Sequence, residues 1–197
     1  MTIPTQAVIL AGGKGTRLGT LTNKIPKPMV DINGVPFLTH LFDLLKENGV
    51  VDVLLLLGYK NQKIVEYYGD GSSHGINIQY SIGEVSWKTG LRLKSALGKI
   101  KNNFLLLYCD NYWPLSLEKL SEFHANHGKK VTVTVFSNKD KTTQNNILAN
   151  EAGLVLKYDK TRLYGGLNGV EIGFFIMDKS LIQNFPDSNY SLEEVLF

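Results

Sequence analysis

Glycines and cations are concentrated in one stretch near the N-terminus, residues 6–28, which reads QAVILAGGKGTRLGTLTNKIPKP. Gly12, Gly13 and Gly15 remove the side chains from three of four positions, so the backbone can adopt positive φ and turn its N–H groups toward one ligand. Four cations accompany them: Lys14, Arg17, Lys24 and Lys27. The planar guanidinium of the arginine suits phosphate oxygens, and the stretch therefore predicts an anion-binding loop.

Two other phosphate-binding loops fit this stretch poorly. A Walker loop requires GxxxxGK followed by Ser or Thr, and a dinucleotide fingerprint requires GxGxxG at the start of a helix. Here Pro26 and Pro28 follow the glycines instead. For the short GGxG pattern alone, a plain glycine turn between two elements is an equal alternative.

An acid ends an apolar run in the middle of the chain, NNFLLLYCDNYWP at residues 102–114. At the C-terminal end of a strand, Asp110 would face the crevice in which open α/β sheets bind ligands. Mg²⁺ prefers one or two carboxylates together with substrate phosphates, so Asp110 is the best metal-ligand candidate and Mg²⁺ the expected cofactor. The alternative for Asp110 is a turn residue at the strand end. Cys109 is expected to be a small buried hydrophobe.

The elements that position these residues alternate between strands and helices. Apolar and alternating runs predict strands at residues 6–10, 52–57, 76–82, 102–110, 131–136 and 167–178, with two short strands around residues 151–153. A helical period predicts helices at residues 37–48, 61–68, 91–99 and 117–126. Gly49 is expected to end the first of these helices and Asn61 to cap the second. The alternation predicts an α/β protein.

Composition narrows the class of protein. The 197 residues, 43% of them hydrophobic, suffice for one sizeable core, so a single domain over residues 1–197 is expected. The formal charge of +3 comes with scattered lysines, which argues against a nucleic-acid surface and suits small molecules that carry phosphate. One cysteine excludes an internal disulfide and fits a reducing compartment. No signal-peptide pattern or membrane span is visible, so a cytoplasmic protein without membrane partners is expected.

Two histidines, His124 and His127, stand three positions apart near the end of a predicted helix. Such a pair could bind a metal, but no further Cys or His lies close in sequence to complete a site. We expect solvated side chains near the helix end.

The longer pattern resembles a known family. LAGGKGTRL, then KIPKPM and INGVPFL, is similar to the opening of the sugar-1-phosphate nucleotidyltransferases, the nucleotide-sugar pyrophosphorylases. The resemblance implies a Rossmann-like three-layer nucleotidyltransferase fold with a mostly parallel mixed central sheet. It also implies an NTP and a sugar 1-phosphate as substrates. Arg17 would grip the β- and γ-phosphates and Lys27 would lie near the reacting centre, as the catalytic residues. The loop residues implied to cradle the NTP are Leu10, Ala11, Gly12, Gly13, Gly15 and Thr16.

A second segment, EVSWKTG, resembles the part of the family that receives the base and ribose, and implies nucleotide contacts for Glu84, Thr89 and Gly90. The family has small residues where this chain has Lys88 and Leu91. An equal alternative makes Thr89 the cap of a helix and Gly90 a packing residue.

The sugar-phosphate side is implied by three further likenesses. The Asp110–Asn111 pair resembles the G-D-N end of a family strand, with cysteine in the place of glycine. Lys160, after an aspartate where the family has glutamate, would contact the sugar phosphate. Gly173 would lie beside the sugar and Glu171 would accept bonds from its hydroxyls. For Glu171 an edge position facing solvent is an equal alternative.

The resemblance also sets open questions. Family members continue to a second metal-binding Asp, and no acid after Lys160 stands in that context. The chain would then lack a C-terminal segment of the family, hold the metal through Asp110 and phosphates alone, or be non-catalytic. LLLYCDNYWP and TGLRLKSAL are most similar to the heptose-1-phosphate guanylyltransferase group, which implies GTP, D-glycero-D-manno-heptose 1-phosphate and a role in lipopolysaccharide or capsule biosynthesis. Some of that group are fused to a phosphatase domain, and such enzymes are often homo-oligomers.

Two other functions stay open. Arg92 after TGL resembles the T-G-G-R of glucose-1-phosphate cytidylyltransferases, so a cytidylyltransferase for another sugar phosphate or a phospho-alcohol is one alternative. The absent second acid favours the other, a nucleotide-binding regulatory subunit without turnover.

Overall fold

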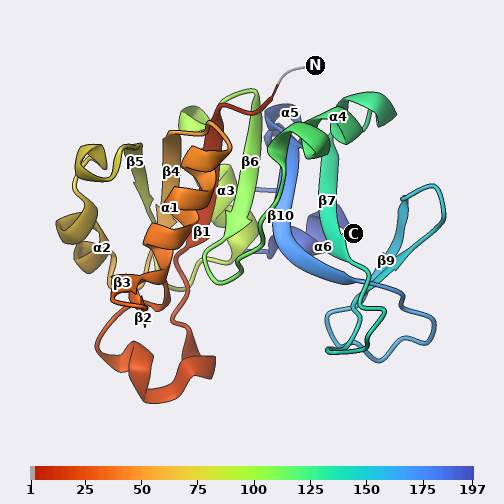
Figure 1. The fold of residues 1–197 in the computed structure, drawn as a ribbon, viewed down its shortest axis with the longest axis horizontal. Helices are drawn as coiled ribbons and strands as arrows, with labels where there is room; N and C mark the ends of the chain where they lie inside the picture. The colour runs from red at the N-terminus through yellow and green to blue at the C-terminus, as the bar shows by residue number, and fades with distance from the viewer. Residues whose placement is uncertain (1–2) are drawn as a thin grey trace.

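One six-stranded sheet organises the computed structural model, which describes residues 3–197 (Figure 1). The strand order is β5-β4-β1-β6-β10-β7. The strands are β1 Gln6–Ala11, β4 Asp52–Leu57, β5 Asn77–Ile82, β6 Asn103–Tyr108, β7 Val131–Phe136 and β10 Val170–Asp178. β5, β4, β1 and β6 run parallel, whereas β10 is antiparallel to both β6 and β7. The predicted mostly parallel mixed sheet is confirmed.

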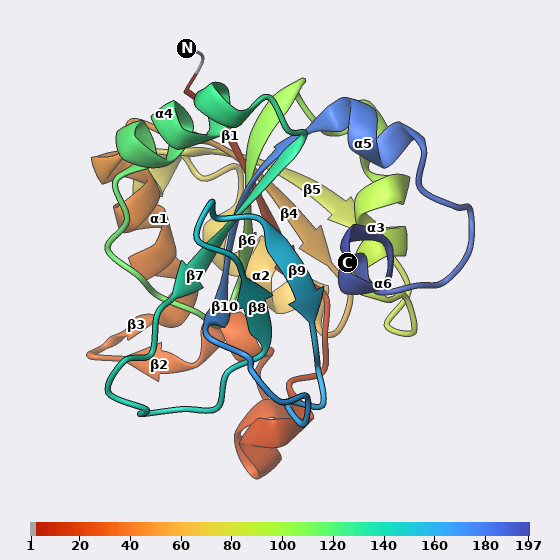
Figure 2. The same cartoon turned by 90° about the vertical axis from the view of Figure 1, so that its right-hand side faces the viewer.

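Helices cover both faces of the sheet, as Figure 2 shows. α1 Phe37–Glu47, α2 Asn61–Tyr68 and α4 Leu117–His127 pack on one face, and α3 Thr89–Ser95, α5 Lys179–Gln183 and α6 Leu192–Leu196 on the other. Successive residues of a strand point to opposite faces. Ile9 accordingly joins the α1 core and Leu10 the α3 core, both almost fully buried. The result is the three-layer architecture expected of the chain.

Short 3₁₀ segments and two small hairpins lie outside the main sheet. They are the 3₁₀ segments η1 Thr16–Asn23, η2 Lys27–Met29, η3 Ser72–His74 and η4 Leu97–Lys99, and the hairpins β2 Asp31–Ile32 with β3 Val35–Pro36 and β8 Ile147–Ala149 with β9 Val155–Tyr158. The two short strands predicted around residues 151–153 are β8 and β9. Figure 1 shows that η1 and the chain after β9 both extend below the sheet.

Some predicted helix ends differ from the structure. Gly49 does follow α1 with φ 74°, as expected of a residue that ends a helix. Asn61 is not the cap of α2: it is the first helical residue, and its amide donates to the Gly58 carbonyl at 3.0 Å while Lys60 occupies the cap position. The helix expected at residues 91–99 starts at Thr89 and is divided into α3 and η4.

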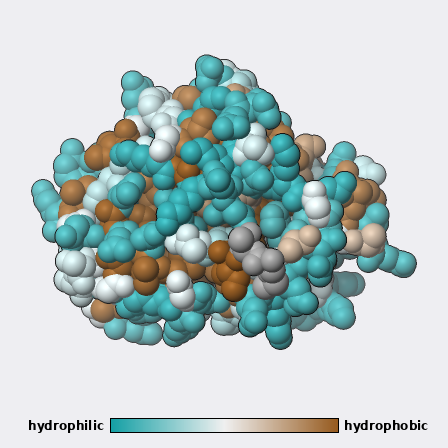
Figure 3. Space-filling view, turned by 90° about the horizontal axis from the view of Figure 1, so that it is seen from above, coloured by the Kyte–Doolittle hydropathy of each residue, from teal (hydrophilic) through white to brown (hydrophobic). Residues whose placement is uncertain are grey.

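The upper surface of the molecule is mostly hydrophilic, with apolar side chains scattered between polar ones (Figure 3). Among residues 3–197, no helix combines the length and the apolar character needed to cross a bilayer.

Candidate functional site

A cleft of about 970 Å³ opens where the parallel strands end. Open α/β sheets bind ligands at this edge, because loops from neighbouring strands converge there. The cleft takes its walls from η1, the start of α3, the residues after β6, the chain after β9, β10 and α6. It brings together six of the predicted site residues: Arg17, Thr89, Asp110, Asn111, Lys160 and Glu171. The loop glycines and Glu84 lie outside its lining.

Lys27 and Asp110 form an ion pair beside this cleft, through Nζ and Oδ2. Pro26 and Pro28 are both buried and hold the lysine at the start of η2, while Asp110 follows β6. Each charged side chain is about one quarter exposed, at 24% and 26%. The two residues lie 83 positions apart in sequence. The lysine offsets the free-energy cost of leaving the Asp110 carboxylate unpaired at the end of the strand.

Asp110 is also a candidate metal ligand at the cleft. Residues 3–197 contain no group of three or more His, Cys, Asp or Glu side chains that could hold an ion by themselves. A single carboxylate fits Mg²⁺, which takes its remaining ligands from substrate phosphates and water. It does not fit an ion that needs an all-protein cage.

The three glycines of the loop occur for different structural reasons. Only Gly15 of the three has positive φ, at 66°, so the expectation of positive φ at Gly12 and Gly13 is wrong. Gly12 is required by packing, because a Cβ there would lie 2.3 Å from Cζ of Arg92. A Cβ on Gly13 would meet nothing within 4 Å, so that position faces open space.

Three other predicted nucleotide contacts are constrained by their place in the fold. Leu10 and Ala11 close β1 and are only 5% and 1% exposed, so their side chains do not face a nucleotide. Thr16 begins η1 and is exposed, together with Arg17.

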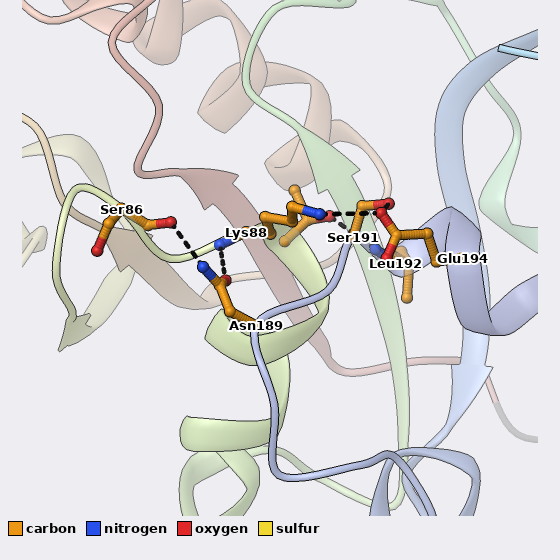
Figure 4. Close-up of polar contacts among 7 residues, drawn as sticks. Ser86, Lys88, Asn189, Ser191, Leu192 and Glu194 are labelled. Atoms are coloured by element: carbon orange, nitrogen blue, oxygen red, sulfur yellow. Dashed lines mark hydrogen bonds and ion pairs between the residues drawn. The ribbon is translucent and has the colours of Figure 1, made fainter.

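The segment before α3 is joined to the C-terminal part of the chain (Figure 4). Asn189 accepts from the Lys88 backbone N–H at 2.7 Å and donates to the Ser86 carbonyl at 3.1 Å. The Lys88 ammonium forms an ion pair with Glu194 at 3.2 Å. Sequence reasoning missed Asn189, since a partner about a hundred residues away leaves no local pattern.

Thr89 and Gly90 fix the same junction. Thr89 does not cap α3: its Oγ1 accepts from the Leu192 N–H at 2.8 Å at the start of α6, and Lys88 holds the cap position without a side-chain bond. Gly90 is buried, and a Cβ there would lie 2.2 Å from the ring of Tyr190. The structure therefore gives Gly90 the packing role and leaves the Thr89 side chain at the cleft wall.

The sugar-phosphate side is built around an irregularity in β10. The pairing of β10 with β7 shifts register between Glu171 and Phe175, and Gly173 in this interval has φ 82°. Asn111 donates to the Ile172 carbonyl at 2.9 Å. The bulge thus brings Asn111 against Gly173 and turns Glu171 into the cleft.

Replacing Gly173 with alanine is expected to destabilise the protein by about 1–3 kcal/mol, because a Cβ there would lie 2.7 Å from Nδ2 of Asn111 on a backbone that side chains rarely adopt. Gly98→Ala is the matched control, since a Cβ on Gly98 meets nothing within 4 Å. Thermal unfolding of both variants checks the expectation. Equal stability of the two would contradict it.

Glu171 is not an edge residue facing solvent, so that alternative is wrong. It lies on β10 opposite Val135 of β7, is only partly exposed, and its carboxylate accepts from the Gly173 N–H. Burial raises the pKa of Glu171 to about 7, opposed by the Gly173 N–H and assisted by the nearby charges of Glu193 and Asp110. This carboxyl therefore loses its proton at a markedly higher pH than an ordinary glutamate.

This pKa makes stability depend on pH. A carboxyl whose pKa rises from 4.5 to about 7 on folding binds its proton more tightly in the folded state, so it adds stability that is complete below pH 4.5 and is lost as pH rises through 7. The melting temperature of the unaltered protein, relative to Glu171→Gln, should therefore fall between pH 4.5 and 8. A constant or rising difference over that range would contradict the shift.

Lys160 is placed by its neighbour Asp159. The Asp159 carboxylate accepts from the backbone N–H groups of Thr161, Leu163 and Tyr164 at 2.9, 3.0 and 2.8 Å. A bond from the Thr161 hydroxyl, together with these backbone bonds, lowers the pKa of Asp159 to about 2. The aspartate organises the turn from which Lys160 reaches the cleft.

Tyr108 and Glu193 form a contact on the same wall that sequence reasoning missed. Tyr108 closes β6 and donates its hydroxyl to Glu193 on α6. Burial first, and then the charge of Glu193, raises the pKa of Tyr108. Both residues line the cleft, so they connect the end of the sheet to its C-terminal wall.

Two other predictions concern residues outside the cleft. Cys109 is 8% exposed within the α1 core, as expected, and burial raises the pKa of its thiol to about 12. His124 and His127 are not free solvated side chains: each contacts the hydroxyl of Thr132 on β7 at 2.7 Å.

The chain is similar in sequence and in fold to known nucleotidyltransferases. Residues 6–146 match the family model described as Nucleotidyl transferase. A D-glycero-alpha-D-manno-heptose 1-phosphate guanylyltransferase of Campylobacter jejuni is 33% identical over 97% of this chain and 84% of its own length. A probable glucose-1-phosphate cytidylyltransferase of Bacillus subtilis is 35% identical over 96% of this chain and 81% of its own. The crystal structure of HddC from Yersinia pseudotuberculosis, complexed with GMP-PN, matches with a TM-score of 0.80 and 27% identity, covering 96% of this chain and 83% of that one.

Proposed function

The chain belongs to the nucleotidyl transferase family, and on that premise we propose that its cleft transfers a nucleoside monophosphate from an NTP to a sugar 1-phosphate, with release of pyrophosphate. The observation that carries the proposal is the Lys27–Asp110 pair at the edge of a cleft that also holds Arg17 and Lys160. The positive charges of Lys27, Arg17 and Lys160 suit two substrates that both carry phosphate.

In this reaction the protein has to align the two substrates and neutralise the negative charge of their phosphates. An oxygen of the sugar phosphate attacks the α-phosphorus, and the bond from that phosphorus to the bridging oxygen of the β-phosphate breaks. The nucleophile has a second pKa of about 6, so it is already anionic at neutral pH and needs no general base. Catalysis then depends on in-line alignment and on cancellation of negative charge.

Each charged residue has a proposed part in this. Lys27 would contact the phosphates at the reacting centre, Arg17 the β- and γ-phosphates, and Lys160 the sugar phosphate. Asp110 would hold Mg²⁺ together with substrate phosphates, and the ion when bound supplies positive charge to the transferred group. Asn111 and Glu171 would bind the sugar.

For the substrates we propose GTP and a heptose 1-phosphate such as D-glycero-D-manno-heptose 1-phosphate. Two guanylyltransferases of that name, from Campylobacter jejuni and Aneurinibacillus thermoaerophilus, support this choice at 33% and 30% identity over most of the chain. A cytidylyltransferase is the second candidate, supported by the 35% identity of the Bacillus subtilis relative. The homo-oligomer, the fused phosphatase domain and the cytoplasmic location stay predictions.

A substrate panel tests the proposal. GTP, CTP, UTP, dTTP and ATP are each combined with heptose, mannose and glucose 1-phosphates in the presence of Mg²⁺, and pyrophosphate release is measured. Release with GTP and the heptose substrate above all other pairs is the expected result. Greater release with CTP and glucose 1-phosphate would favour the second candidate. Binding of an NTP without release from any pair would contradict catalysis and favour a regulatory subunit.

A further inference from the structure

Arg92 is a buried cation that the proposed chemistry does not use. Its side chain on α3 is 5% exposed. All its hydrogen-bond acceptors among residues 3–197 are backbone carbonyls: those of Trp87 at 3.1 Å, Leu57 at 2.7 Å, Gly12 at 3.4 Å and Glu84 at 2.5 Å. A buried charge is costly unless it is hydrogen-bonded, so these neutral acceptors are what keep the guanidinium in place.

The acceptors lie at the end of one strand and in the loops that follow two others. Gly12 comes after β1, Leu57 ends β4, and Glu84 follows β5. The loops close tightly on the guanidinium, since a Cβ on Gly58 would lie 2.6 Å from Nη2. Arg92 therefore connects these segments beneath the glycine loop, and we call its guanidinium with the four carbonyls the Arg92 hub. Gly12 and Gly58 must be glycines because a side chain at either position would overlap the guanidinium.

The hub also fixes the direction of one peptide group. In a planar trans peptide, the carbonyl of one residue and the N–H of the next point in opposite directions. The Gly12 carbonyl accepts from Arg92 and from the Tyr59 N–H at 3.1 Å. The Gly13 N–H consequently points away from the hub, at a position where a Cβ would meet nothing within 4 Å.

We propose that Arg92 is a positioning residue for the nucleotide, which holds the Gly12 carbonyl so that the Gly13 N–H is aimed at the phosphates of the bound NTP. Its charge, which no carboxylate neutralises within residues 3–197, adds attraction for a polyphosphate from beneath the loop. The inference rests on the proposed function, because it takes an NTP as the ligand of the loop.

Arg92→Lys separates this role from general stability. Lysine keeps the positive charge, but its single ammonium cannot donate to all four carbonyls as the planar guanidinium does. Its Kd for a non-hydrolysable GTP analogue should rise about tenfold or more, in line with the loss of one or two charge-assisted hydrogen bonds. The KM for sugar 1-phosphate should stay within about twofold. Lys94→Met is the control on the same helix, since its ammonium donates to the Gln183 carbonyl outside the cleft.

Three outcomes bear on the inference. An unchanged Kd in a folded Arg92→Lys variant would overturn it, as would an equal loss of affinity for both substrates. No binding of any NTP to the unaltered protein would instead overturn the proposed function. If the variant does not fold, ¹⁵N NMR of the unaltered protein decides: the GTP analogue should shift the Arg92 Nε–H resonance while sugar 1-phosphate alone should not, and an unshifted resonance would overturn the inference.

Discussion

Replacing Lys27 with alanine is expected to lower kcat by about 10²-fold or more, because electrostatic groups at a reacting centre are typically worth that much. The variant removes the cation that pairs with Asp110 at the cleft. The fold should survive, since Lys27 lies in a short 3₁₀ segment whose flanking prolines carry the packing. Pyrophosphate release under saturating substrates measures the effect.

Lys63→Ala provides the control for loss of a positive charge. Lys63 lies on α2 with an exposed side chain and belongs to neither the loop nor the cleft. It should keep kcat close to that of the unaltered protein. Turnover within a few-fold of normal in Lys27→Ala would contradict the role given to this lysine.

Asp110→Asn is expected to have the second large effect, also about 10²-fold or more in kcat. Asparagine keeps the size of the side chain but removes the charge that would hold Mg²⁺ and pair with Lys27. The response of the remaining activity to Mg²⁺ should weaken as well. Titrating activity with Mg²⁺ in both proteins, after chelator treatment, measures the two effects together.

Asp43→Asn is the matched control, because Asp43 also pairs with a lysine, Lys46, at 2.9 Å, but on the exposed face of α1. Exposed pairs of this kind contribute little, so its kcat and Mg²⁺ response should stay unchanged. An Asp110→Asn variant with the same half-activating Mg²⁺ concentration as the unaltered protein would show that another group holds the metal.

The sequence was sufficient for features that depend on local patterns. Strand β4 lies at the predicted residues because a continuous apolar run marks a parallel strand covered on both faces. Asp110 faces the cleft, as predicted, because burying an unpaired carboxylate inside the sheet would cost much free energy. Lys160 and Glu171 line the same cleft. The family resemblance predicted this position for both residues, whereas hydrophobic periodicity alone could not.

Features that depend on distant partners were not predictable. Arg92 was singled out only for its resemblance to a cytidylyltransferase motif, and its buried contacts appear only when backbone carbonyls 5 to 80 positions away close on it. The same holds for Asn189, whose partners Ser86 and Lys88 lie about a hundred residues earlier. Gly12 was expected to give the backbone access to positive φ, but the residue is a glycine because the Arg92 guanidinium lies beside it, which the sequence does not show.

The central claim is that an oxygen of a sugar 1-phosphate attacks the α-phosphorus of an NTP within this cleft. The most direct test uses the best sugar 1-phosphate of the panel, labelled with ¹⁸O at its three non-bridging phosphate oxygens, and follows the label by ³¹P NMR and mass spectrometry. The account predicts that the nucleotide-sugar keeps all three labelled oxygens, one of them in the bridge between its phosphorus atoms, and that pyrophosphate carries none. Labelled pyrophosphate, or a nucleotide-sugar that has lost label, would contradict it.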